Sequence, residues 1–142
     1  MRAFNVLRID HIVIRVAEME RSIAFYGDVL GCTVVKSRDD LGLTHLRAGT
    51  SMIDLVSLDG PLGKRGGVAP QKEGRNIDHF CLRIEPFVEA EIAKHLAEHG
   101  VQPVGPAEEN FGAEGDGLSL YFHDPDGNLV EVKVTSKLPP SV

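Results

Sequence analysis

Two eight-residue stretches of the chain share one pattern of apolar and polar positions. IDHIVIRV covers residues 9–16 and IDHFCLRI covers residues 77–84, and each places an Asp-His pair ahead of alternating side chains. Side chains two apart in a strand share a face, so the histidine and the arginine four residues later lie on the same face. The other face is wholly apolar in both stretches. The pattern predicts two equivalent strands with one face packed against helices and the other available for binding.

An amphipathic helix is predicted after each of these strands. Apolar side chains recur at helical spacing in residues 19–31 and again in residues 85–100, and a glycine ends each run, Gly31 and Gly100. Three strand-like runs follow each predicted helix. They cover residues 32–37, 43–49 and 51–58 in the first half, and residues 101–105, 118–124 and 128–134 in the second. Both halves therefore have the order β-α-β-β-β.

This repeat predicts the fold class. One βαβββ half leaves a face of its sheet uncovered by its single helix, and pairing two halves lets the sheets curl into a shared cup. We therefore expect an α+β fold in which two βαβββ modules form a curled mixed-sheet cup. The predicted single domain covers residues 8–135, with one module at about 8–58 and the other at about 76–135. Residues 136–142 are expected to form a flexible tail.

Two glycine-rich segments are predicted to be the variable loops of the domain. Residues 58–76 join the halves and are basic, whereas residues 105–117 are acidic. Long loops in a compact domain serve as lids or linkers, and a plain linker is an equally good interpretation of the first segment.

Composition narrows the classes of function. A chain of 142 residues with 42% hydrophobic residues fits one compact domain. The formal charge of −6 and the lack of a dense Lys/Arg run argue against nucleic-acid binding and favour a small-molecule substrate. No signal-peptide pattern or membrane span is present, so we expect a cytoplasmic protein with no membrane partner. The two cysteines, Cys32 and Cys81, are expected to be reduced thiols.

A carboxylate interrupts an apolar strand in each half. Asp54 lies in SMIDLVSL and Glu131 lies in NLVEVKV, where the preceding turn HDPDGN sets the register of the strand. A carboxylate in such a strand needs a partner. Together with His11 and His79, the two carboxylates could form an octahedral nitrogen and oxygen metal site with positions left for water or substrate.

A second pair of histidines has a different interpretation. His95 and His99 are four residues apart on the second predicted helix, a spacing at which two imidazoles could bind one metal ion. The neighbouring Glu91 and Glu98 instead favour an exposed polar face, and we adopt this second interpretation.

At the histidine and glutamate positions the sequence resembles the vicinal oxygen chelate superfamily. The resemblance covers about residues 8–135 and depends on DHIVIRV, RSIAFYGDVLG, DHFCLRI and YFHDPDGNLVEV. It implies one divalent ion per site (Zn, Ni, Co, Mn or Fe) held by His11, His79 and Glu131. Asp54 occupies the fourth ligand position, where glyoxalases and epimerases of this superfamily have Glu or Gln. Its side chain is one methylene shorter than Glu, so three alternatives stay open: Asp54 binds the ion directly, through water, or not at all.

The resemblance also implies a choice of functions. The first is a metal-dependent lyase or isomerase of the glyoxalase or epimerase type, which stabilises an enediolate-like intermediate of a small anionic substrate. Glu131, or failing it Asp54, would move the proton. Arg15 and Arg83 would bind the anionic substrate, although both could instead be solvated strand ends.

Two alternatives remain open at this point. An extradiol-type iron dioxygenase would use His45 and Tyr121, which fall close to the acid–base positions of that branch. The other alternative is a metal-free protein that binds small molecules, as in drug resistance. The resemblance further implies a homodimer, in which the modules pair either within one chain or across the dimer.

Overall fold

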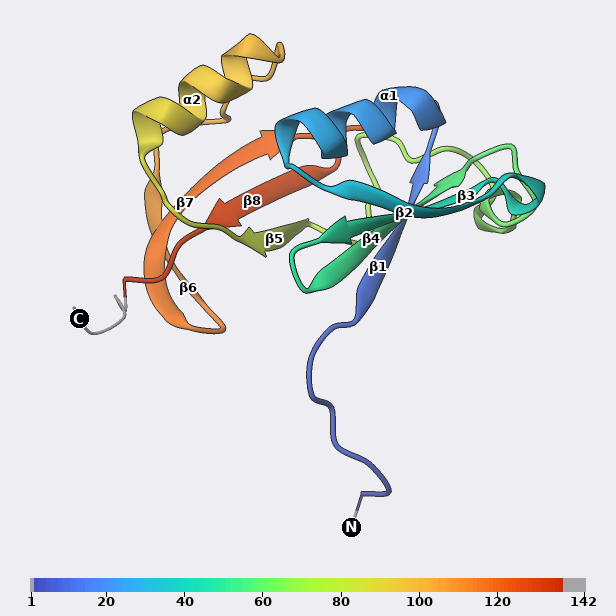
Figure 1. Cartoon of the computed structure of the whole chain (residues 1–142), viewed down its shortest axis with the longest axis horizontal. Helices are drawn as coiled ribbons and strands as arrows, with labels where there is room; N and C mark the ends of the chain where they lie inside the picture. Colours follow the sequence, from blue (N-terminus) through green and yellow to red (C-terminus); the bar gives the residue numbers. More distant parts are fainter. Residues whose placement is uncertain (1, 137–142) are drawn as a thin grey trace. The chain divides into compact units, whose positions relative to one another are not determined.

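The chain forms two compact units, residues 1–69 and 70–142, in a computed structural model that describes residues 2–136 (Figure 1). Each unit contains one four-stranded mixed sheet and one α-helix. The predicted α+β fold with two βαβββ modules is confirmed. The division between the units falls inside the segment 58–76 that was predicted to join the modules. In residues 2–136 no helix is long and apolar enough to cross a membrane.

The first unit contains the first repeat of the sequence. Its elements are β1 (His11–Val16), α1 (Met19–Ala24), β2 (Thr33–Arg38), β3 (Leu43–Ala48) and β4 (Ser51–Ser57). The strands are ordered β1-β4-β3-β2, with β1 parallel to β4 and the other pairs antiparallel. Because β4 lies between β1 and β3, a residue at its centre has neighbours from both of those strands.

The helix of the first unit changes its winding before it ends. α1 continues as a π-helical turn, Phe25–Val29, and the chain leaves it through Gly31 at φ 74°, a conformation that glycine adopts without steric cost. Phe25 and Tyr26 are buried in this turn, with their rings edge to face. They belong to the apolar core of the unit together with Leu46, Ile53 and Leu55.

The second unit repeats the same order of elements. They are β5 (His79–Arg83), α2 (Glu89–Glu98), β6 (Glu108–Gly112), β7 (Gly115–His123) and β8 (Leu129–Lys133). The strands are ordered β5-β8-β7-β6, with β5 parallel to β8. Buried side chains from α2, β7 and β8 form its core: Leu96, Leu120, Phe122, Val130 and Val132.

One predicted strand is misplaced. Residues 101–105 are irregular, and the strand lies instead at 108–112, inside the segment predicted to be a loop. Val104 donates one backbone hydrogen bond to Tyr121 of β7, but Pro103 and Pro106 on either side have no N–H to donate, so the regular ladder begins only at residue 108. Gly117 of β7 allows the β6–β7 hairpin to approach the backbone that follows β8. A Cβ at this position would lie 1.8 Å from the carbonyl oxygen of Val134.

The segment after β8 begins with ordered contacts. The backbone N–H and the hydroxyl of Ser136 both donate to the carbonyl oxygen of Asp116, each at 2.8 Å. The remainder of the predicted tail, residues 137–142, lies outside the described residues.

Candidate functional site

Each sheet holds a buried carboxylate at the centre of the strand that lies between a parallel and an antiparallel neighbour. Asp54 on β4 and Glu131 on β8 are each only 5% exposed. Each has a side chain of the next antiparallel strand directly opposite it, His45 on β3 for Asp54 and Tyr121 on β7 for Glu131. On the other side runs the parallel strand that carries the Asp-His pair, β1 or β5. The repeat therefore generates two equivalent polar clusters, one in each unit.

In the first unit the cluster contains His11, Asp54 and His45. The Nε2 atom of His11 lies 4.0 Å from Oδ2 of Asp54, and the Nδ1 atom of His45 lies 2.9 Å from Oδ1. Oδ1 is buried, and although the His45 nitrogen is within ion-pair distance, Oδ1 accepts no hydrogen bond. Oδ1 is therefore in contact with an imidazole nitrogen but without a well-aligned hydrogen bond.

In the second unit the carboxylate has more partners. The Nε2 atom of His79 lies 3.0 Å from Oε1 of Glu131, and the hydroxyl of Ser119 donates to Oε2 at 2.6 Å. The ring of Tyr121 meets the ring of His79 edge on, with the centroids 5.4 Å apart. The sequence interpretation missed Ser119. Strand alternation would have found it, because Ser119 shares a face of β7 with Tyr121.

The repeated Asp-His pair has a physical function in both strands. Asp10 Oδ1 lies 2.7 Å from Nδ1 of His11, and Asp78 Oδ2 lies 2.6 Å from Nδ1 of His79. With Nδ1 held by the preceding aspartate, Nε2 is directed toward the buried carboxylate of the neighbouring strand. A carboxylate behind a histidine in this way orients the ring as a metal ligand. The hydrogen bond to Asp10 also raises the pKa of His11, and the same contact lowers the pKa of Asp10.

Glu131 is held in its ionised form. Burial alone would raise its pKa, but hydrogen bonds from Ser119, Tyr121 and Cys81, together with the nearby His79, outweigh burial and lower it. Burial and the contact with Glu131 conversely raise the pKa of Tyr121 to about 12, so its hydroxyl stays a donor near neutral pH.

Comparison with known proteins fits this arrangement. The sequence model described as the Glyoxalase/Bleomycin resistance protein/Dioxygenase superfamily matches residues 8–132. This chain belongs to that superfamily.

Three known proteins, two compared by sequence and one by structure, are among those similar to this chain. Glyoxalase domain-containing protein RDO1 of Mycosarcoma maydis is 34% identical over 92% of this chain and 70% of its own length. Ethylmalonyl-CoA/methylmalonyl-CoA epimerase of Cereibacter sphaeroides is 30% identical over 89% of this chain and 96% of its own. The solved structure of integron cassette protein VCH_CASS1, from the mobile metagenome of V. cholerae, has a TM-score of 0.74 at 28% identity and covers 95% of this chain and 100% of its own.

The side chain of Arg15 already has hydrogen-bond partners within the chain. Arg15 donates to the carbonyl oxygens of Gly63, Val68 and Gly67 in the segment after β4. A Cβ at Gly66 would lie 2.4 Å from the guanidinium of Arg15, so a larger residue there would displace this flexible side chain. The guanidinium therefore anchors part of the predicted linker. Substrate binding by Arg15 stays a prediction.

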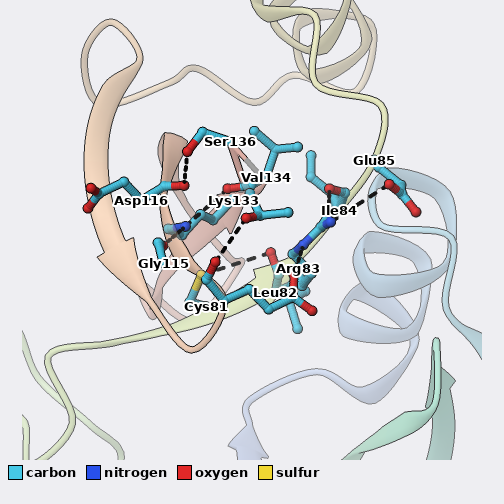
Figure 2. A network of polar contacts seen from close by, with 12 residues as sticks. Cys81, Leu82, Arg83, Ile84, Glu85, Gly115, Asp116, Lys133, Val134 and Ser136 are labelled. Carbon is cyan, nitrogen blue, oxygen red and sulfur yellow. Dashed lines mark hydrogen bonds and ion pairs between the residues drawn. The ribbon is translucent and has the colours of Figure 1, made fainter. Parts of the chain in front are cut away.

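Arg83 and Lys133 bond to residues at the turn between β6 and β7, and Figure 2 shows Lys133 beside Gly115. Nε of Arg83 donates to Glu114 Oε2 at 2.7 Å, and Nη2 lies 3.7 Å from Glu85. The buried ammonium of Lys133 donates to the carbonyl oxygens of Gly115 and Val134, at 2.8 and 3.0 Å. These cations fix the hairpin, and substrate binding by Arg83 stays a prediction.

Each cluster offers an imidazole nitrogen and a carboxylate oxygen, which are donors that suit a divalent metal ion. Within residues 2–136, no three His, Cys, Asp or Glu side chains gather as a metal site. The buried Oδ1 of Asp54, which accepts no hydrogen bond, is an oxygen that a cation would satisfy. The four-ligand site of His11, His79, Glu131 and Asp54 stays a prediction.

The thiol of Cys81 yields a prediction about reactivity. Its partial burial and the charge of Glu131 raise its pKa to about 12, although the residue is exposed. In metal-free protein at pH 8 we expect iodoacetamide to alkylate it at least roughly tenfold more slowly than an ordinary thiol with a pKa of about 8.5, because the much smaller thiolate fraction outweighs the greater nucleophilicity of a more basic thiolate. Glu131→Gln should lower the thiol pKa and speed the reaction. Alkylation at the ordinary rate in a Cys32→Ser background, which isolates this thiol, would contradict the expectation.

Proposed function

We propose that this superfamily member is a divalent-metal-dependent lyase or isomerase of the glyoxalase or epimerase type, acting on a small anionic substrate. One observation carries the proposal: both Asp-His strands direct an imidazole Nε2 toward a buried carboxylate on the neighbouring strand. Such pairs are suited to metal binding, because the aspartate fixes the ring and the carboxylate supplies an oxygen donor.

His11, His79 and Glu131 would hold the ion, with Asp54 as the fourth ligand. A bound divalent ion would supply Lewis-acid stabilisation of negative charge on a substrate oxygen. Superfamily members generally use divalent metals. Nitrogen and carboxylate oxygen donors suit Zn, Ni, Co, Mn or Fe, and the donor set does not select among them.

Proton transfer next to a carbonyl or hydroxyl group of the substrate would be carried out by residues of the chain. Glu131 is the first candidate for the base, because it is ionised near neutral pH and carries its charge among fixed donors. Asp54 is the second candidate. The similarity to an ethylmalonyl-CoA/methylmalonyl-CoA epimerase supports an acid, such as a CoA-linked acid, as the class of substrate.

The role of Asp54 can be measured separately. Because its buried Oδ1 accepts no hydrogen bond, we propose that it binds the ion directly. Asp54→Ala should then weaken metal affinity at least tenfold, as measured by competition with a chelating dye. Asp54→Asn, which keeps the shape of the side chain, should weaken it as well. Unchanged affinity in both variants, with unchanged activity, would leave Asp54 with a purely structural role.

The reaction type is tested by hydrogen exchange. The metal-loaded protein is incubated in deuterium oxide with a panel of small 2-hydroxy, 2-oxo and CoA-linked acids, and exchange of the α-hydrogen is followed by NMR. Enzyme-dependent exchange with one member of the panel is expected. Oxygen consumption with a catechol and added iron, in place of exchange, would contradict the lyase or isomerase proposal.

An iron-dependent extradiol dioxygenase is the second candidate function. It is favoured by the contact between His45 and the buried Asp54, because a carboxylate beside an imidazole can orient it for acid–base chemistry. Tyr121, beside His79, could act with it. Loss of oxygen consumption in His45→Ala with metal still bound would support this candidate. Tight binding of a small molecule without metal or turnover would instead support a binding protein.

We also propose a homodimer, an expectation that comes from the family resemblance. Light scattering on the purified chain tests it directly, with twice the chain mass as the expected result.

A further inference from the structure

α2 carries two exposed histidines near its C-terminal end. His95 lies in the last turn of the helix and His99 directly follows its last residue, Glu98. Their ring centroids are 4.7 Å apart, and the ring planes are inclined at 58°. Two imidazoles four residues apart on a helix lie on one face, one above the other.

A hydrogen bond to the backbone of His95 determines which ring nitrogen of His99 carries a proton. Its Nδ1 lies 2.9 Å from the backbone carbonyl oxygen of His95. A carbonyl oxygen can only accept a hydrogen bond, so Nδ1 carries the proton and Nε2 keeps its lone pair. This arrangement is the usual one behind a histidine that binds a metal through Nε2.

The spacing of the two rings matches that of two imidazoles on one ion. A zinc-to-nitrogen bond is about 2.0–2.1 Å, which places the centroids of two imidazoles bound side by side roughly 4.5–5 Å apart. The observed 4.7 Å lies inside this range. The separation of the rings is therefore compatible with both imidazoles binding one ion.

The local charge also favours a cation. The C-terminal end of a helix carries partial negative charge from its unpaired carbonyl groups. Glu98 adjoins His99, Glu91 lies one helical turn before His95, and the whole chain has a formal charge of −6.

We infer that His95 and His99 form a second metal site, which binds a divalent ion with a preference for imidazole nitrogen: Cu²⁺, Ni²⁺ or Zn²⁺. One ring nitrogen of each histidine binds the ion, and water completes the coordination. Cu²⁺ binds most tightly, following the general order of affinities for nitrogen sites. The proposal goes beyond the interpretation of these residues as an exposed polar face, which their exposure in the structure fits. It shares no residue with the site proposed above and does not depend on that function.

The test uses the full metal-stripped chain with Cu²⁺ as the probe. The His79→Ala substitution is placed in the background so that the other proposed site does not contribute, and binding is followed by calorimetry. His95→Gln and His99→Gln should each lower Cu²⁺ affinity at least tenfold. His123→Gln removes an exposed histidine on β7 and should leave the affinity unchanged.

A second measurement needs no substitution in α2. An ion that links residues four apart holds the last helical turn closed, so Cu²⁺ should slow hydrogen exchange of the amides of residues 95–100 in the His79→Ala protein. Equal Cu²⁺ affinity with and without the two imidazoles, or exchange in this segment that Cu²⁺ does not change, would overturn the inference.

Discussion

Replacement of His79 with alanine is expected to lower the affinity for the divalent ion at least a hundredfold. The substitution removes the imidazole whose Nε2 lies 3.0 Å from Glu131, and it leaves the second unit with a carboxylate alone. Loss of a ligand should cost more than loss of a supporting residue, which typically costs ten- to a hundredfold. Affinity is measured by chelator competition on the stripped protein.

The fold should survive this change. His79 is only half-buried, at the start of β5, so the metal-free variant should unfold at nearly the same temperature as the metal-free parent. His123→Ala, on β7 of the same unit, is the matched control and should keep the metal. A His79→Ala protein that binds the ion as tightly as the parent would exclude His79 as a ligand.

Replacement of Glu131 with glutamine is expected to abolish substrate hydrogen exchange in the metal-loaded protein. Glutamine places an amide NH₂ at the position of one carboxylate oxygen. That oxygen is either the one that accepts a hydrogen bond from the hydroxyl of Ser119 or the one that faces His79. Glutamine also cannot take up a proton. Removal of a general base costs about 10²–10⁴-fold in rate, and loss of a charged ligand adds to this.

Two controls separate the roles of Glu131. Glu109→Gln removes an exposed carboxylate from β6 in the same unit and should leave exchange unchanged. Ser119→Ala keeps the carboxylate but removes its 2.6 Å hydrogen bond, and it should slow exchange far less than Glu131→Gln. Full exchange in Glu131→Gln with metal bound would show that another group, such as Asp54, moves the proton.

The repeated pattern of the sequence was sufficient to predict the main strands. A wholly apolar face opposite His11 and His79 assigned the two faces of each strand, and the positions of Asp54 and Glu131 in apolar runs marked them as partnered carboxylates. Period-two alternation is a strong signal because a shift by one residue would expose the apolar face.

Other features depend on contacts that the sequence does not encode locally. The strand at 108–112 has a polar sequence, EENFG, and exists because β7 pairs with it. The strand face of Arg15 is predictable, but alternation does not reveal that its guanidinium reaches carbonyl oxygens about fifty residues further along the chain. Long side chains at strand ends can bend toward loops, so alternation alone does not fix their partners.

The central claim is that one ion uses ligands from both repeats, and metal stoichiometry in paired variants tests it most directly. Native mass spectrometry with elemental analysis is applied to the parent chain, His11→Ala and His79→Ala after loading with Zn²⁺ and gel filtration, in a His95→Gln/His99→Gln background. We predict about one ion per chain in the parent and almost none in either variant, because each imidazole contributes to the same ion. A full ion retained in either variant, or two ions in the parent with one left in each, would contradict the account.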